Sequence, residues 1–265
     1  MLTRIIVSIV AIPLIILTIL FGKIYFLIFI SAVSSIALYE FLTFSKNKNS
    51  YPQVNVSLIL GLLFIWNAYF SFIDFQILLL LSILLTSLIE LFRDKNSAII
   101  NLGITYLGIL YIPIFLSSLI YLREYDKIFY YNGAYLILGI IVSIWTCDSA
   151  AYFVGIKIGK HKIFPRVSPK KSWEGSIAGL ISAIIAMVIL QKYLLDFITF
   201  RQAVIMGIVI GVFGQIGDLI ESLFKRDAGV KDSSNLIPGH GGFFDRFDSL
   251  IFIAPIMEII LKFIK

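Results

Sequence analysis

The sequence predicts an all-α polytopic integral membrane protein with about nine transmembrane helices. Of its 265 residues, 59% are hydrophobic and 14% are charged, and the mean hydropathy is +0.97. Soluble domains contain about 45–50% apolar and about 25% charged residues. A soluble fold has too little interior to bury this much apolar surface. The apolar residues also recur in runs of roughly 20, the length that crosses a bilayer core of about 30 Å.

These apolar runs define the predicted spans. They lie near residues 5–21, 24–40, 54–72, 75–92, 98–122, 133–154, 173–194, 202–224 and 244–264. The first run resembles a signal peptide, but it lacks a small-x-small cleavage site and further spans follow at once. We therefore expect it to remain as the first helix. Only Gly22 and Lys23 separate the first two runs, which form either a tight helical hairpin or a partly re-entrant pair.

Charge asymmetry predicts the orientation of the chain. With the N-terminus and the loops after even-numbered spans on one side, 15 of the 22 lysines and arginines fall on that side. The positive-inside rule then predicts a cytoplasmic N-terminus and a C-terminus on the outer side. The net charge of +6 suits cytoplasmic loops and anionic headgroups. No long basic run or aromatic RNA-binding motif indicates nucleic acid as a partner.

Polar residues are unevenly distributed, which predicts two functional regions. Residues 1–140 carry few polar groups inside their spans and are expected to be a scaffold, whereas residues 141–265 are expected to carry the catalytic site. Within the second region, residues 222–248 concentrate acids and bases around a glycine-rich turn. The single cysteine, Cys147, excludes an intrachain disulfide and a Cys-based structural metal site, so we expect a small buried side chain there.

Asp148 lies inside the predicted sixth helix. An ionised carboxylate there costs at least ~2.5–3.5 kcal/mol unless it faces a cavity or a partner. Helical spacing puts Asp148 on one face with Ala151, Tyr152 and Gly155. The small residues suit either a close helix contact or a polar pocket. Asp148 is therefore either a site residue or half of a structural ion pair.

A basic loop of residues 157–172 follows. Its charge fits topology and headgroup attraction alone, but its end, Ser168-Pro169-Lys170-Lys171-Ser172, also suits phosphate binding. Ser172 is the expected N-cap of the seventh helix. A helix N-terminus with free N–H groups, a hydroxyl and two lysines favours a bound phosphate. Gly175 and Gly179 predict tight helix packing just beyond.

One face of the eighth span changes from small to polar residues. Its members recur at spacings of three and four: Gly207, Gly211, Gly214, Gln215, Asp218, Glu221, Ser222 and Lys225. The glycines allow close packing, and the polar end lies on the predicted cytoplasmic side. Asp218 is predicted to be a cavity carboxylate because Ile216, Leu219 and Ile220 cover the remaining face.

The last helix adds two more acids, since Asp245 and Asp248 lie three residues apart in its first turn. With Asp218 from the facing helix they form a natural cage for a hard cation such as Mg²⁺. Four basic residues around them would neutralise a polyphosphate: Lys225, Arg226, Lys231 and Arg246. Gly241 and Gly242 permit a turn that presents backbone N–H groups to an anion, and His240 beside them is either structural or in contact with substrate.

This combination predicts phosphoryl or nucleotidyl transfer at a membrane surface. No Gly-x4-Gly-Lys-Ser/Thr motif is present in the sequence, which argues against a P-loop ATPase. An ion-coupled transporter using Asp148, Asp218 and Lys225 is an alternative from another class. Against it, the charges cluster at one end of the helices and no inverted repeat is found. A purely structural scaffold leaves the buried acids unexplained.

The motifs resemble those of a known family, the phosphatidate cytidylyltransferases (CDP-diacylglycerol synthases). The run carrying the main resemblance is Ser222-x-Phe224-Lys225-Arg226-x4-Lys231-Asp232-x-Ser234-x2-Ile237-Pro238-x-His240-Gly241-Gly242-Phe243-x-Asp245-Arg246-Phe247-Asp248. Ser168-Pro169-Lys170-Lys171-Ser172-x-Glu174-Gly175 and Asp148-x-x-Ala151-Tyr152 also resemble the family. The similarity covers about residues 145–250, and the first 140 residues match only as a series of hydrophobic spans.

The resemblance implies that CTP and phosphatidate react to give CDP-diacylglycerol and pyrophosphate, with Mg²⁺. A CTP-dependent transferase for another lipid phosphate or a polyprenol is the alternative within this class. The family pattern implies that Asp218 and Asp245 hold the metal with support from Asp248. The family is also associated with a two-cation centre, for which K⁺ is a candidate second ion, and with homodimers. We expect a multi-pass protein of a bacterial inner membrane that takes phosphatidate from the cytoplasmic leaflet, with its site facing the cytoplasm.

The predicted site residues form two groups. The expected catalytic residues are Asp218, Lys225, Arg226, Asp245 and Asp248. The expected substrate- and phosphate-binding residues are Asp148, Ser168, Lys170, Lys171, Ser172, Ser222, Lys231, Asp232, His240, Gly241, Gly242 and Arg246.

Overall fold

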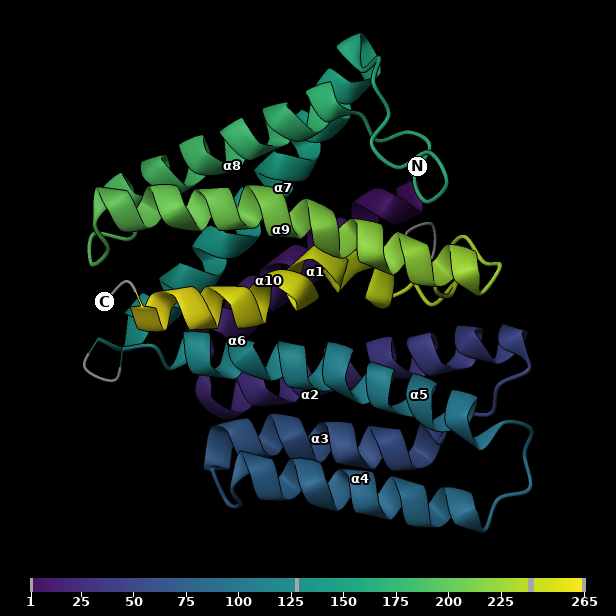
Figure 1. Ribbon diagram of the computed structural model, residues 1–265. Helices are drawn as coiled ribbons and strands as arrows, with labels where there is room; N and C mark the ends of the chain where they lie inside the picture. The colour runs from purple at the N-terminus through teal and green to yellow at the C-terminus, as the bar shows by residue number, and fades with distance from the viewer. Residues whose placement is uncertain (1, 127–128, 238–240, 264–265) are drawn as a thin grey trace. The chain divides into compact units, whose positions relative to one another are not determined.

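The computed structural model describes residues 2–126, 129–237 and 241–263, and its named elements there are all helical. They are α1 (Leu2–Phe21), α2 (Lys23–Phe44), η1 (Ser45–Lys48), α3 (Val54–Phe70), α4 (Phe75–Leu91), α5 (Ala98–Ile109), η2 (Leu110–Ile114), α6 (Phe115–Arg123), α7 (Tyr130–Ile158), α8 (Trp173–Tyr193), α9 (Phe200–Asp227) and α10 (Phe244–Phe263). The elements α5, η2 and α6 are continuous and together form one long helix, Ala98–Arg123, at the predicted span 98–122. The other long helices also lie at predicted apolar runs (Figure 1).

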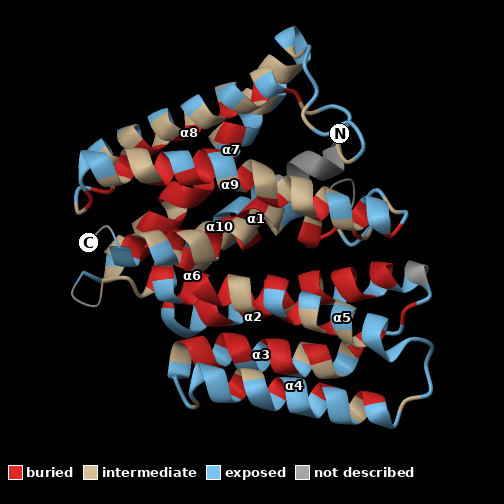
Figure 2. Ribbon diagram, viewed as in Figure 1, coloured by how far each residue is buried: buried red, intermediate tan, exposed pale blue. Residues whose placement is uncertain are grey.

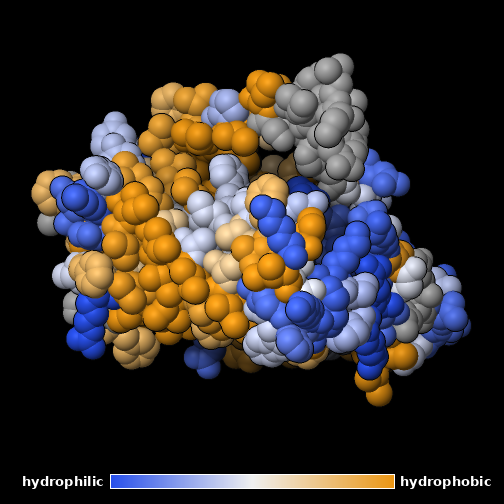
Figure 3. All heavy atoms as spheres, turned by 90° about the horizontal axis from the view of Figure 1, so that it is seen from above, coloured by the Kyte–Doolittle hydropathy of each residue, from blue (hydrophilic) through white to orange (hydrophobic). Residues whose placement is uncertain are grey.

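Five of these helices are long and apolar enough to cross a membrane. They are Lys23–Phe44, Ala98–Arg123, Tyr130–Ile158, Trp173–Tyr193 and Phe200–Asp227. Large apolar side chains are also exposed along them, as on α8, where Ile177, Ile181, Ile185 and Ile189 are each 52–53% exposed. A broad hydrophobic area bordered by hydrophilic side chains is visible on the face drawn in Figure 3. The protein is therefore a multi-pass membrane protein.

Close packing divides the chain into two compact units. Unit 1 comprises residues 1–121 and 224–247, and unit 2 comprises residues 122–223 and 248–265. This division differs from the predicted boundary near residue 140. The predicted boundary separated an N-terminal scaffold from a C-terminal catalytic region. These two roles stay a prediction.

The core of unit 1 lies where α2, α3, α5 and η2 pack together, and Figure 2 shows their buried faces in red. Leu38 and Ile112 are fully buried there. Pro113 lies in the π-helical η2. Proline lacks a backbone donor and clashes with the preceding turn, and a local widening of the helix accommodates it. Gly22, with a φ of 57°, joins α1 and α2, which are separate helices.

An aromatic cluster in unit 1 joins α2 to the ends of α9 and α10. The ring of Phe41 lies edge-on to Phe224 at 5.6 Å and to Phe244 at 5.8 Å between centroids. Tyr111 contacts the same two rings at 5.5 and 6.3 Å. Such edge-to-face pairs contribute about 0.5–1.5 kcal/mol each beyond area burial. The cluster fixes the C-terminal end of α9 and the start of α10 against the N-terminal helices.

Small residues let the helices of unit 2 approach closely. A Cβ added to Gly175 would lie 2.6 Å from the Ala151 carbonyl oxygen, and one added to Gly179 would lie 3.0 Å from that of Cys147. The predicted glycine packing at the start of α8 is therefore confirmed, and Cys147 is buried as predicted. Ala151 faces α8, but Tyr152 is 63% exposed, so the face expected to include both residues is split.

The glycine face of α9 works in the same way. A Cβ on Gly207 would lie 2.6 Å from Ile184 Cα of α8, and one on Gly211 would lie 2.8 Å from Leu180 Cα. Further along, a Cβ on Gly217 would lie 2.7 Å from Phe252 Cβ and 3.0 Å from the Asp248 carbonyl oxygen of α10. At these glycines α9 packs closely against α8 and α10, with little space for a side chain between the helices. This close packing positions the polar end of α9.

Candidate active site

Three carboxylates of unit 2 meet where α9 crosses α10. One oxygen from each of Asp218, Glu221 and Asp248 lies within 4.8 Å of the others. Asp218 and Glu221 share a face because they are three residues apart on α9. The close approach at Gly217 brings Asp248 to them from α10. Glu221 is only 1% exposed, whereas Asp218 and Asp248 are half-buried, so the acidic cluster is partly accessible.

One lysine from the start of α8 partly neutralises the acidic cluster. Lys171 Nζ lies 2.6 Å from Asp218 Oδ2 and donates a 3.4 Å hydrogen bond to the Gln215 carbonyl oxygen. Ser222 Oγ donates to Asp218 Oδ1 at 3.4 Å. Asp148, an exposed residue of α7, lies within electrostatic reach of both Asp218 and Lys171. Lys171 thus lies against Asp218 and within electrostatic reach of Asp148.

The acidic cluster has the donor chemistry that a hard cation requires. Mg²⁺ prefers carboxylate oxygens together with water and phosphate oxygens. Like charges in a low-dielectric region repel strongly, and a bound cation would relieve that repulsion. Asp218, Glu221 and Asp248 thus fit a divalent cation. Asp248 was predicted as support for the metal, whereas Glu221 was noted on the same face but was not assigned as a ligand.

The basic loop before α8 is fixed by backbone contacts. Ser172 is buried and caps the helix by accepting a 3.3 Å hydrogen bond from the Gly175 N–H, which confirms the predicted N-cap. The Lys171 N–H donates to the Ser168 carbonyl at 3.3 Å. Lys170 is exposed, in contrast to the inward Lys171. The two neighbouring lysines therefore have different surroundings.

Asp245 belongs to a second polar group, in unit 1. Its Oδ1 lies 2.6 Å from Lys225 Nζ, and both side chains are buried. Its Oδ2 accepts hydrogen bonds from the Ser233 N–H and hydroxyl, both at 3.0 Å, and from the Gly242 N–H at 2.8 Å. Gly241 has a φ of 82°, a conformation that favours glycine, and supports this turn. The assignment of Asp245 as a metal ligand stays a prediction.

Glu40 of α2 holds the same loop and was missed by the sequence analysis. This buried carboxylate accepts four hydrogen bonds, from the hydroxyls of Ser233 and Ser234 at 2.9 and 2.6 Å and from the N–H groups of Phe243 and Phe244 at 3.1 and 2.8 Å. The sequence pattern that could have revealed it is an acid inside an apolar span. That reasoning was applied to Asp148 but not to Glu40.

The remaining predicted residues lie at the surface or outside the described chain. Arg226, Lys231, Asp232 and Arg246 are exposed, and Arg226 donates to the Val230 carbonyl at 3.1 Å. His240 lies outside the described residues, so its predicted contact with substrate is untested. The structure thus assembles two groups. Unit 2 brings together Asp148, Lys171, Asp218, Ser222 and Asp248, and unit 1 brings together Lys225, Gly242 and Asp245.

Comparison with known proteins places the whole chain in one family. The profile of the cytidylyltransferase family matches residues 2–264. The chain belongs to the cytidylyltransferase family. The resemblance seen in the sequence covered about residues 145–250, and the family match extends it to the N-terminal helices. The matched range therefore contains the positions of Glu40 and of the acidic cluster.

Relatives of this cytidylyltransferase match it over nearly their full length. The phosphatidate cytidylyltransferase of Bacillus subtilis (strain 168) is 34% identical over 267 residues, which cover 97% of this chain and 96% of the relative. That of Staphylococcus saprophyticus is 33% identical over 98% of this chain and 97% of the relative. That of Staphylococcus haemolyticus is 32% identical over 97% and 98%.

Proposed function

We propose that this protein is a phosphatidate cytidylyltransferase of phospholipid biosynthesis. It would transfer the cytidylyl group of CTP to phosphatidate, giving CDP-diacylglycerol and pyrophosphate. The observation that carries the proposal is the full-length similarity to enzymes of that name, combined with an acidic cluster next to a basic helix start. The motif run at residues 222–248 supports the same reaction.

In this reaction a phosphate oxygen of phosphatidate attacks the α-phosphorus of CTP. A new P–O bond forms, the bond between the α-phosphorus and the α,β-bridging oxygen breaks, and pyrophosphate leaves with the electron pair. The protein contributes positioning and charge. Lys171 contacts Asp218 of the acidic cluster, and we assign it to a substrate phosphate. Lys170, the N-cap Ser172 and the bases of residues 225–246 would hold the remaining negative charge.

We assign a Mg²⁺ ion to Asp218, Asp248 and Glu221. The donor set supports this assignment, since three carboxylate oxygens lie within 4.8 Å of one another. When bound, such an ion supplies charge neutralisation at phosphate oxygens. Asp245 as an additional ligand, and K⁺ as a second cation, are kept from the family resemblance. Lys171 would exchange its present contact with Asp218 for a substrate phosphate.

We also propose the placement of the enzyme. Nine transmembrane helices are expected from the apolar runs. A cytoplasmic N-terminus and a site facing the cytoplasm are expected from the charge asymmetry of the loops. Phosphatidate would then enter from the cytoplasmic leaflet of a bacterial inner membrane, and CTP from the cytoplasm. A homodimer is expected from the family resemblance.

The test of the reaction is a reconstituted assay. Purified protein in detergent receives labelled CTP, phosphatidate and Mg²⁺, and CDP-lipid and pyrophosphate are measured. We expect equal amounts of both products, and chelation with EDTA should stop the reaction until Mg²⁺ is restored. Folded protein that forms neither product would refute the proposal. Replacing phosphatidate by an ether lipid phosphate or a polyprenyl phosphate distinguishes the alternative acceptors. Solute or proton flux in liposomes without CTP consumption would favour the transporter.

A further inference from the structure

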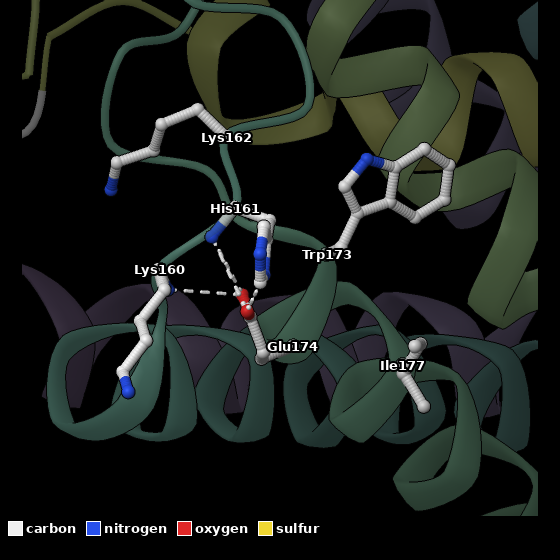
Figure 4. Close-up of a pocket in the computed structure, with 6 residues that line it drawn as sticks. All are labelled: Lys160, His161, Lys162, Trp173, Glu174 and Ile177. Atoms are coloured by element: carbon white, nitrogen blue, oxygen red, sulfur yellow. Dashed lines mark hydrogen bonds and ion pairs between the residues drawn. The ribbon is translucent and has the colours of Figure 1, made fainter.

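A pocket of about 720 Å³ lies beside the N-terminus of α8, and the carboxylates of the acidic cluster do not line it. It is lined by Lys160, His161, Lys162, Trp173, Glu174 and Ile177 (Figure 4). In Figure 4 the two lysine side chains lie on one side and Trp173 and Ile177 lie on the other, with the His161–Glu174 pair between them. The pocket therefore has a cationic side and an apolar side.

The loop that forms the cationic side is held in place. Glu174 accepts hydrogen bonds from the Lys160 and His161 N–H groups, at 3.2 Å each, and its carboxylate lies 2.6 Å from His161 Nδ1. The backbone N–H of Trp173 donates to the backbone carbonyl of His161 at 2.9 Å. The Glu174 carboxylate therefore interacts with the Lys160 and His161 N–H groups and with the His161 ring. The ammonium groups of Lys160 and Lys162 are exposed, with Lys162 in one 3.4 Å contact to the Lys170 carbonyl.

The apolar side continues along the helix. Trp173, Ile177, Ile181, Ile185 and Ile189 follow one another at intervals of four residues, and each is more than half exposed. This isoleucine stripe belongs to a helix that is long and apolar enough to cross a membrane. A tryptophan at the start of such a helix is typical of the membrane interface. The pocket therefore suits a ligand with an anionic part beside the lysines and an apolar chain along the stripe.

We propose that this pocket binds the phosphate headgroup of an anionic glycerophospholipid, with an acyl chain packed on the isoleucine stripe. Two cations at the interface end of an exposed apolar stripe complement an amphipathic anion, which a soluble phosphate ester cannot match over its whole length. The site is separate from the acidic cluster and needs no CTP. Phosphatidate belongs to this ligand class, so under the proposed function the pocket would concentrate substrate close to Lys171.

Trp173 makes the site directly measurable. The chain has three tryptophans, so Trp66→Phe and Trp145→Phe leave Trp173 as the sole reporter in the full-length protein. The protein is reconstituted in phosphatidylcholine bilayers that contain a small fraction of a brominated lipid. This lipid is either phosphatidylglycerol or phosphatidylcholine, in each case brominated on an acyl chain near the glycerol end. We expect brominated phosphatidylglycerol to quench Trp173 fluorescence at a lower mole fraction than brominated phosphatidylcholine.

A matched pair of variants tests the role of the pocket. Lys160→Gln with Lys162→Gln should reduce the preference for the anionic lipid by about fivefold per lysine. Lys157→Gln with Arg166→Gln removes two charges from the same region without touching the pocket lining, and should keep the preference. An equal loss in both pairs would show diffuse surface attraction only and overturn the proposal. Absence of any anionic preference in the parent protein would also overturn it.

Two further measurements keep the test decisive. Excess soluble glycerol 3-phosphate should leave the quenching unchanged. If it fully reversed the quenching, the pocket would be a site for soluble anions instead of a lipid site. If the glutamine pair does not reconstitute, Lys160→Arg with Lys162→Arg must retain the preference, and loss of preference in that pair contradicts the proposal. All of these measurements are made without CTP or turnover, so their failure is distinguishable from failure of the proposed function.

Discussion

Lys171 Nζ lies 2.6 Å from Asp218 Oδ2, which ties the residue before the α8 N-cap to the polar face of α9. This contact is the direct link between the basic loop and the acidic cluster within unit 2. A lysine in this place competes with a cation for the same carboxylate. It would also supply positive charge to a phosphate bound there. The two roles lead to different consequences when the lysine is removed.

Replacing Lys171 by Gln should therefore tighten cation binding and weaken catalysis. Without the lysine, the acidic cluster is less compensated and attracts a divalent cation more strongly. Turnover should still fall, because a substrate phosphate loses the cationic partner that we assign to it. Binding of Mn²⁺, followed by electron paramagnetic resonance, and formation of CDP-lipid measure the two effects separately. Lys170→Gln is the control, since Lys170 is exposed, and an unchanged Mn²⁺ affinity is expected for it. Weaker Mn²⁺ binding in Lys171→Gln contradicts this account.

Asp218→Asn should abolish cation binding at the acidic cluster. It removes the charge from the carboxylate that contacts both Lys171 and Ser222. We expect a loss of turnover on the order of 100-fold or more, with folded protein retained in size-exclusion chromatography. Glu258→Gln, which alters an acid of α10 that pairs with Lys262, is the matched control and should keep both properties. Full activity of Asp218→Asn over a range of Mg²⁺ concentrations would remove Asp218 from the metal site.

Gly217→Ala should separate α9 from α10 at the acidic cluster. The added Cβ would meet Phe252 Cβ at 2.7 Å and the Asp248 carbonyl oxygen at 3.0 Å, so the helices must move apart. Overpacking of this kind costs about 1–3 kcal/mol. The thermal midpoint in detergent and the Mn²⁺ affinity should both fall. Gly103→Ala in α5, where nothing lies within 4 Å of the new Cβ, should lower neither. Equal behaviour of the two variants would count against the close crossing.

Glu40→Ala should loosen the loop between α9 and α10. It leaves the Ser234 hydroxyl and the Phe243 and Phe244 N–H groups without this acceptor, at about 1–3 kcal/mol for each buried group left unsatisfied, while the Ser233 hydroxyl keeps its contact with Asp245. Limited proteolysis should cut within residues 228–243 faster than in the parent protein. Turnover should also fall, because Ser233 contacts both Glu40 and Asp245. Asp94→Ala, at an exposed acid, is the control. An unchanged cleavage rate in Glu40→Ala would refute the role.

Much of the fold follows from local sequence patterns. Runs of apolar residues place the helices to within a few residues, because helix length is set by chain composition along each run. Helical spacing also brings Asp218, Glu221 and Ser222 to one face, and glycine at position 217 explains how Asp248 reaches them. The number of helices that cross the membrane and their direction depend on the bilayer, and they stay predictions.

Contacts between distant segments were not predictable in this way. Glu40 is 193 residues from Ser233 and 204 residues from Phe244, and no local period connects them. Lys225 and Asp245 were both identified, one for phosphate and the other for metal, yet in the structure they pair with each other. A sequence shows which residues can bear charge, whereas the packing decides which opposite charge each one meets.

The attachment of Glu40 to the loop after α9 has a consequence for biosynthesis. Translation produces α2 long before the donors at residues 233–244 exist, so the ribosome delivers a helix with a solitary carboxyl group to the membrane. A charged side chain at the centre of a membrane-spanning helix costs about 2.5–3.5 kcal/mol on insertion scales, and the cost falls towards the helix end, where Glu40 lies. Until the final hairpin is made, α2 carries this carboxylate without the hydrogen-bond donors that it has in the finished fold. Ribosome-bound intermediates truncated before residue 233 should therefore be recognised by membrane quality control, whereas the completed chain escapes it.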